Sequence, residues 1–159
     1  MGISSRPIDP RGHRFGAGLS LIVLALGFLA QLPLVIPAVA IALGVSAFFG
    51  TRYSILGRPW PYVRRALRIG PPAELESEFP PRFAQLLGTV GLGLATLLLA
   101  TGLTAGAWLV GAAVGGLQLV LAATGYCLGC RLYFLRWYAP HLFDRLAAVT
   151  SRDAVGRSV

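Results

Sequence analysis

Residues 108–138 read WLVGAAVGGLQLVLAATGYCLGCRLYFLRWY, a long apolar run followed by the two cysteines of the chain. No side chain is charged from Trp108 up to the first cysteine, Cys127. At about 1.5 Å rise per residue, a helix of this length can cross a bilayer core of about 30 Å. The sequence therefore predicts a transmembrane helix over residues 107–128, with Cys127 and Cys130 at one membrane surface.

A straight helix over this run, advancing about 100° per residue, has a face of small side chains and a face of bulky ones. The small face contains glycines at GxxxG spacing, which lets another helix approach closely. The neighbouring face carries both cysteines, so we expect these to point toward protein and the bulky face toward lipid. The same small face is compatible with a homo-oligomer. It consists of Gly111, Gly115, Gln118, Ala122, Gly125 and Gly129.

The composition predicts an integral membrane protein. The chain has 159 residues, is 55% hydrophobic and 13% charged, and has a mean hydropathy of +0.69. It is too apolar for a soluble domain and too short for more than one bundle. The apolar runs predict an all-α, four-helix bundle built of two antiparallel transmembrane hairpins. The expected transmembrane helices are 15–32, 34–50, 83–103 and 107–128, with a cytoplasmic loop at 51–82 and a cytoplasmic tail at 139–159.

The arginines predict the orientation in the membrane. The net charge is +8, and all 14 basic residues are arginine. They precede the first apolar run, lie between the second and third, and follow the fourth, whereas the two short connections are uncharged. By the positive-inside rule, both termini and the central loop are cytoplasmic. We therefore expect a multi-pass protein of a bacterial inner membrane, surrounded by lipid, with no nucleic-acid partner.

The central loop has a basic part and an acidic part. Residues 60–69, WPYVRRALRI, have the spacing of a short amphipathic helix on the inner leaflet, although an ordinary arginine-rich loop explains them equally well. Residues 70–81, GPPAELESEFPP, are acidic and bracketed by prolines. They suit either a docking surface for a soluble partner or a solvated linker.

The two halves of the chain resemble each other. An Arg-Phe pair opens each predicted hairpin, and a YSILGR segment in the first half matches YCLGCR in the second. Duplication of one hairpin explains this match, and so does shared membrane composition. Under duplication, the cysteines occupy positions where the first half has a serine and a glycine. The matching segments are 14–15 with 82–83 and 53–58 with 126–131.

Three segments resemble one protein family. They are IDPRGHRF at 8–15, PPAELESEFPPRFAQLLG at 71–88 and GYCLGCRLYFL at 125–135. Together they resemble the small bacterial membrane proteins of domain-of-unknown-function family 4395, whose most specific element is the Cys-Leu-Gly-Cys motif. The resemblance implies four membrane helices and no established activity. Because members are often associated with thioredoxin-like or rhodanese-like proteins, it also implies sulfur chemistry with such a soluble partner.

The candidate catalytic residues are Cys127, Cys130 and Arg131. In a CxxC on a helix, the Cα atoms are about 5 Å apart, which suits a disulfide. A cytosolic location predicts reduced thiols. Arg131 stands where the family often has an acidic residue, and an arginine favours the thiolate. The end of a helix opposes a thiolate, whereas a break at Gly125 or Gly129 would place the pair at a helix start.

Three functions are compatible with these residues. In the first, the thiols form a redox or sulfur relay with a soluble thioredoxin- or rhodanese-like partner, with a bilayer quinone as a compatible cofactor. In the second, the chain is a non-catalytic membrane anchor or adaptor with structural cysteines. In the third, His13 and His141 complete a Cys2His2 metal set, but lone histidines are more often surface residues, so no metal site is assigned. Whether the chain is an enzyme is left open.

Overall fold

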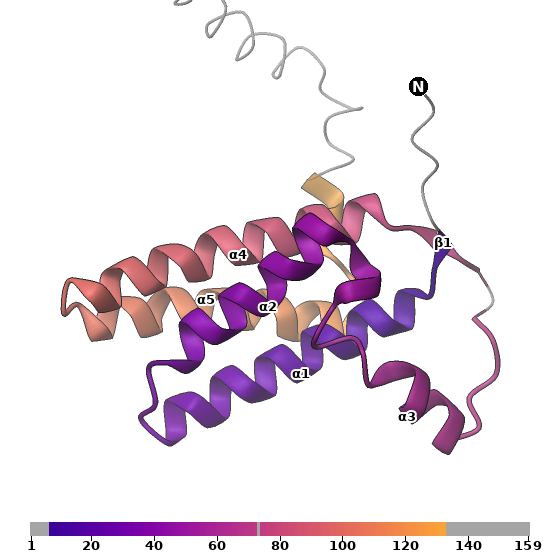
Figure 1. Ribbon diagram of the computed structural model, residues 1–159, viewed down its shortest axis with the longest axis horizontal. Coiled ribbons are helices and arrows are strands. Elements are labelled where there is room, and N and C mark those ends of the chain that lie inside the picture. The colour runs from indigo at the N-terminus through magenta and orange to yellow at the C-terminus, as the bar shows by residue number, and fades with distance from the viewer. Residues whose placement is uncertain (1–6, 73, 133–159) are drawn as a thin grey trace, which may run out of the picture.

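The computed structural model describes residues 7–72 and 74–132 (Figure 1). Its regular secondary structure is helical except for one pair of two-residue strands, and turns and loops connect these elements. The predicted tail at 139–159, the aromatic-basic run at 133–138 and His141 lie outside the described residues. The elements are β1 (Pro7–Ile8), α1 (Pro10–Leu29), α2 (Val35–Phe49), η1 (Thr51–Tyr53), α3 (Trp60–Ala66), β2 (Glu76–Ser77), α4 (Phe79–Ala100) and α5 (Thr104–Thr124). Residues 128–132 are again helical.

The four long helices contact one another in a closed cycle: α1 with α2, α2 with α4, α4 with α5 and α5 with α1. The turn between α1 and α2 and the turn between α4 and α5 lie at one end of the molecule, and α3 and the strands lie at the other (Figure 1). Small side chains allow the helices to approach closely at their centre. The core consists of Leu24, Ile36, Val39, Ala40, Leu43, Leu92, Ala95 and Ala107.

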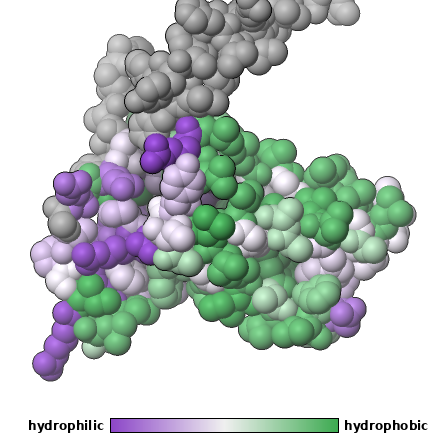
Figure 2. Space-filling model, turned by 180° about the vertical axis from the view of Figure 1, so that it is seen from behind, coloured by the Kyte–Doolittle hydropathy of each residue, from purple (hydrophilic) through white to green (hydrophobic). Residues whose placement is uncertain are grey.

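Three helices, α1, α4 and α5, are long and apolar enough to cross a membrane, judged by length and composition. Helix α2 is apolar but has only 15 residues, or about 22 Å at about 1.5 Å per residue. Hydrophobic side chains cover the outside of the helices, and hydrophilic ones gather at the end that carries α3 (Figure 2). An apolar exterior of this kind fits a membrane protein.

Helix α1 begins at Pro10, earlier than the predicted start at Phe15. Asp9 caps the helix, because its Oδ1 accepts a hydrogen bond from the backbone N–H of Arg11 at 2.9 Å. Pro10 stands in the first turn, where a missing N–H costs little. The prediction was wrong because the first turns of the helix are polar and the apolar run starts only after them.

Helix α4 likewise begins at Phe79 and not at Phe83. Pro80 and Pro81 occupy its first turn, where proline is tolerated. The sequence prediction treated these prolines as the end of a linker. Because the helix begins before them, Arg82 lies in its first turns and faces the end of α2.

The short helix predicted within residues 60–69 is present as α3. Two side chains of α3 contact the residue that caps α1. Trp60 Nε1–H donates to Asp9 Oδ2 at 3.1 Å, and Arg64 Nη1 forms an ion pair with the same oxygen at 3.5 Å. The Trp60 ring also packs on Phe15, with 5.6 Å between ring centroids. These contacts place α3 beside the first turns of α1.

Arginine side chains cap the C-terminal ends of two long helices. Arg82 donates from Nε and Nη2 to the carbonyl oxygens of Ala47 and Phe48, both at 3.0 Å, at the end of α2. Arg14 donates from Nη2 to the corresponding carbonyls at the end of α5, at 3.2 and 3.3 Å. Each hairpin thus supplies the arginine that caps the other hairpin.

The strands show the same relation between the halves. Strand β1 precedes α1, β2 precedes α4, and the two pair antiparallel with Pro7 opposite Ser77 and Ile8 opposite Glu76. Each half therefore contributes one strand, one hairpin and one capping arginine. This correspondence is what duplication of a single hairpin predicts.

Replacing Arg82 by methionine is expected to lower the free energy of unfolding by about 1–3 kcal/mol, because two carbonyls at the end of α2 lose a charged donor. The measurement is the thermal denaturation midpoint of the protein in lipid nanodiscs. Arg65→Met is the control, because Arg65 is exposed on α3. Equal midpoints for the two variants would contradict the capping role.

Candidate functional site

Helix α5 ends at Thr124, before both cysteines, so the predicted continuous helix over 107–128 is wrong. Gly125 has φ 75° and ψ 0°, in the left-handed region that glycine adopts most readily. A Cβ on Gly125 would lie 3.2 Å from Arg14 Nη1, so a larger residue would also push the capping guanidinium aside. The backbone N–H of Tyr126 then donates to Thr124 Oγ1 at 3.1 Å. Of the two break points considered from the sequence, the break is at Gly125.

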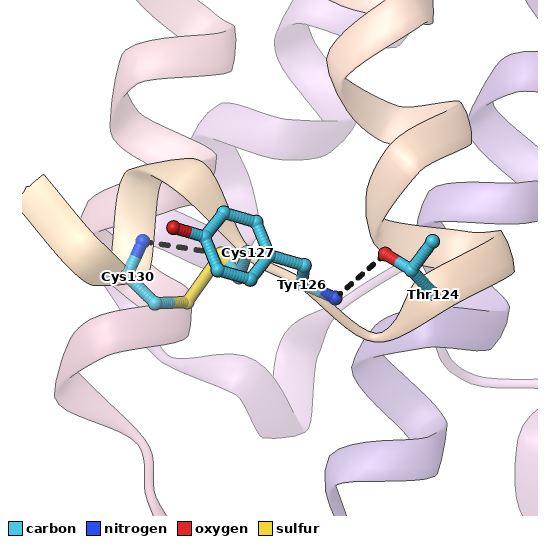
Figure 3. Close-up of a disulfide and its surroundings, with 4 residues drawn as sticks. All are labelled: Thr124, Tyr126, Cys127 and Cys130. Carbon is cyan, nitrogen blue, oxygen red and sulfur yellow. Dashed lines mark hydrogen bonds between the residues drawn. A yellow bond between two sulfur atoms is a disulfide. The ribbon is translucent and has the colours of Figure 1, made fainter.

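Cys127 begins the next helix. Its carbonyl accepts the N–H of Arg131 at 3.0 Å, and its Sγ accepts the N–H of Cys130 at 3.1 Å (Figure 3). These are the two hydrogen bonds that an N-cap residue makes. Residues 128–132, which follow, are helical. The pair therefore lies where backbone N–H groups favour a thiolate, and not at the helix end that opposes it.

The structure joins Cys127 and Cys130 in a disulfide, with the Cα atoms 5.1 Å apart. The separation agrees with the distance predicted for CxxC spacing. The expectation of reduced thiols rests on a cytosolic location and stays a prediction, because the geometry shows that the two sulfurs are close enough to bond and does not set their redox state in the cell. Both residues are half-buried. The pair can therefore be reached from outside without moving a long helix.

The first half contains a related turn without cysteines, although η1 separates it from the end of α2 and the residues after Ser54 form a turn and not a helix. Helix α2 also stops at a glycine of positive φ, Gly50, at 102°. Four residues later, Ser54 Oγ accepts the N–H of Gly57 at 3.1 Å, just as Cys127 Sγ accepts the N–H of Cys130. A serine and a glycine thus support the same side-chain hydrogen bond in the positions of the two cysteines. This one hydrogen bond does not depend on sulfur.

An open groove of about 980 Å³ exposes both cysteines. Its walls carry charges of both signs, including Arg131, whose guanidinium carbon lies 5.3 Å from the centre of the Tyr126 ring. Glu74 and Glu76, from the segment predicted to be a docking surface or a linker, also line it. The groove is shaped by the starts of α1 and α4 and by the turn after α5. Its other charged residues are Arg11 and Arg14.

A second cavity, of about 220 Å³, lies between the long helices. Cys127 lines this cavity as well as the groove, whereas Cys130 lines only the groove among the cavities described. The walls are mainly leucine, alanine and glycine. Three buried polar atoms of its lining residues have no hydrogen-bond partner among the described residues: His13 Nε2, Gln85 Oε1 and Gln118 Oε1.

His13 lies beside the cysteines. One of its ring nitrogens and the two Sγ atoms are all within 4.8 Å of one another, and all three residues are half-buried. The sequence placed His13 near the thiols only as part of a four-ligand set with His141. The geometry joins His13 to both cysteines through α1, a helix far away in sequence. His141 lies outside the part of the chain that the structure describes.

The sequence did not reveal the roles of two glutamines. Gln85 was not singled out, and Gln118 was assigned to the small face of the helix, yet the Oε1 of each is buried without a partner in the described ranges. The available signal was a glutamine in an otherwise apolar helix. A glutamine in an apolar helix does not predict which way its side chain faces. Only the packing of the helices shows that both residues line one cavity.

The comparisons with known proteins identify the family and nothing more specific. No curated protein and no solved structure matches the chain. The model of the family described as "Domain of unknown function (DUF4395)" matches residues 8–137, which include both hairpins and the cysteine pair. The chain therefore belongs to the DUF4395 family, as its three resembling segments indicated.

Proposed function

We propose that this protein is a membrane-embedded thiol–disulfide relay in which Cys127 and Cys130 alternate between disulfide and dithiol. The observation that carries the proposal is the matching turn of the first half, where Ser54 and Gly57 make the same hydrogen bond without sulfur. This hydrogen bond does not require a cysteine, so the two sulfur atoms are available for exchange chemistry.

The groove suits the exchange step with a soluble thioredoxin- or rhodanese-like protein. A partner thiolate attacks Cys130 Sγ, a mixed disulfide forms, and Cys127 leaves as a thiolate that the N–H of Cys130 stabilises. A second partner thiolate then breaks the mixed disulfide. The partner ends as a disulfide, and the pair ends as a dithiol. Both cysteines line the groove, and Cys130 is the proposed point of attack because the thiolate that leaves is then Cys127, whose Sγ accepts the N–H of Cys130.

A quinone of the bilayer is the proposed electron acceptor. The dithiol transfers two electrons and two protons, which gives a quinol and restores the disulfide. The inner cavity supports this role, because the unpartnered Oε1 atoms of Gln85 and Gln118 can accept hydrogen bonds from the hydroxyl groups of the quinol product. Leu87 and Leu117 line the same cavity and are exposed on the outside of α4 and α5, which offers a route from lipid.

The proposed topology has four spans, with both ends and the groove on the cytoplasmic side. The described arginines lie in elements at the end of the molecule that holds the cysteines, and both hairpin turns at the other end are uncharged. The shorter α2 serves as the fourth span because it packs along α4 and α1. In this orientation, a cytosolic partner reaches the cysteines directly.

Single substitutions test the proposed order of attack. In nanodiscs, Cys127→Ser is expected to retain a stable mixed disulfide on Cys130 after incubation with oxidised glutathione, because the resolving sulfur is absent. Cys130→Ser is expected to retain several-fold less on Cys127, because a thiolate that the N–H of residue 130 stabilises is the better leaving group and the weaker nucleophile. Intact-protein mass spectrometry measures both adducts.

Two other outcomes would change the proposal. Equal adducts on the two variants would contradict the order of attack. Thiols that remain unmodified in both variants and in the reduced wild-type protein would contradict the relay itself. A persulfide on the protein isolated from membranes, in place of a disulfide, would favour sulfur transfer over electron transfer.

A further inference from the structure

We propose that His13, Cys127 and Cys130 form a zinc site when the disulfide is reduced. The three ligand atoms lie within 4.8 Å of one another, which small side-chain rotations can bring to the spacing of ligands around one ion. They come from two segments that the fold brings together, the second turn of α1 and the turn after α5. The proposal does not depend on the relay, because it needs only the reduced pair and the histidine.

The donor set suits Zn²⁺. Two thiolates and one imidazole are ligands that zinc binds well. His13 Nε2 is buried and has no hydrogen-bond partner among the described residues, so no protein group competes for this nitrogen when the ring turns to bind a metal. The ring enters the site from α1, whose second turn is held by the Asp9 cap and by α3.

Metal and disulfide exclude each other at this site. A disulfide offers no thiolate, so zinc can bind only after a reductant has converted the pair to two thiols. Binding then releases the two thiol protons to solvent, and both sulfurs become metal ligands. No change in the oxidation state of zinc is involved. The expected site is therefore empty in the oxidised form and filled in the reduced form.

Three protein ligands leave the fourth position of a tetrahedral ion open. All three residues also line the large groove, so this position is accessible to water or to a thiolate that enters from outside. Structural zinc sites are closed by four protein ligands, whereas sites with an open position bind or activate another molecule. The geometry thus points to a zinc ion that can take a sulfur ligand from the groove.

Cobalt and zinc titrations of the full-length protein in nanodiscs test the site. With the pair reduced by a phosphine, one equivalent of Co²⁺ is expected to give thiolate-to-cobalt charge-transfer absorption, which Zn²⁺ then removes. His13→Gln is expected to weaken Zn²⁺ binding by more than the roughly 10–100-fold that loss of an outer-shell partner costs. Oxidised wild-type protein is expected to bind neither ion at this site.

His141→Gln is the matched control, and it is expected to bind zinc like the wild type. Absence of the charge-transfer band, or unchanged affinity in His13→Gln, would overturn the proposal. Loss of binding in His141→Gln would overturn the three-ligand arrangement in favour of a closed set. Glutathione trapping on Cys130 in a protein that carries both His13→Gln and Cys127→Ser reports the relay separately, so failure of one proposal leaves the other testable.

Discussion

Replacing Cys127 by serine and Cys130 by glycine together is expected to abolish thiol exchange and leave the fold intact. These are the residues that the first half of the chain has at Ser54 and Gly57, where the same hydrogen bond forms. The exchange rate with oxidised glutathione should fall to that of the uncatalysed reaction, because no sulfur remains in the chain outside its methionine.

The stability of the double variant distinguishes the relay from an adaptor with structural cysteines. A disulfide that closes so short a loop contributes at most about 2 kcal/mol in the chain-entropy model. The double variant should therefore unfold within about 1 kcal/mol of the reduced wild type, since the serine hydroxyl can accept the same backbone N–H. The measurement is chemical denaturation in nanodiscs under reducing conditions. A variant that no longer inserts or assembles would show that the cysteines are structural after all.

The second large effect is expected at Gly125. Gly125→Ala should lower the free energy of unfolding by about 2–4 kcal/mol, from two sources. A left-handed backbone costs an L-residue about 1–2 kcal/mol. The new Cβ would push the guanidinium of Arg14 aside and weaken its two hydrogen bonds to carbonyls, which costs about 1–2 kcal/mol. The guanidinium atoms lie 3.2–3.5 Å from that Cβ.

Substitutions at two other glycines measure the backbone cost separately from the contribution of Arg14. Gly102 has φ 82°, and no atom of the described residues lies within 4 Å of the place that an alanine methyl would take, so Gly102→Ala should show only the backbone cost. Gly116 lies inside α5 with the same open surroundings, so Gly116→Ala should be neutral or stabilising by up to about 1 kcal/mol. Denaturation of the three variants in nanodiscs gives the comparison. Equal losses for Gly102 and Gly125 would show that Arg14 contributes nothing.

Gly125→Ala should also change the chemistry of the pair. If α5 continues through residue 125, Cys127 no longer caps the next helix, and its Sγ loses the N–H of Cys130. The fraction of disulfide at a given ratio of oxidised to reduced glutathione should then shift. Mass-tag counting of free thiols across a series of such ratios measures that shift. If the disulfide fraction depends on the ratio as in the wild type, the helix break at Gly125 does not affect the redox behaviour of the pair.

The positions of the long helices were predictable because apolar runs of membrane length have few alternative structures. Their starts were not, since charged and proline-containing first turns at Pro10 and Phe79 resemble loops in sequence. The end of α5 was harder still. Gly111, Gly115 and Gly125 look alike in sequence, and only the last is met by Arg14 from another helix.

The candidate site was predictable only where its residues form a motif. Cys127, Cys130 and Arg131 stand together in the chain, and their spacing alone allowed a disulfide. His13 reaches them through the packing of α1 against α5, and Gln85 through that of α4. Such contacts join segments that are distant in sequence and form only in the folded chain, so no local sequence pattern predicts them.

The exchanged arginine caps also bear on the origin of the chain. Since Arg14 closes α5 and Arg82 closes α2, neither hairpin is complete by itself. A progenitor gene that encoded one hairpin would have yielded a self-associating product with two equivalent turns. Under duplication, fusion of two such genes would have allowed the two turns to differ, one with cysteines and the other with serine and glycine.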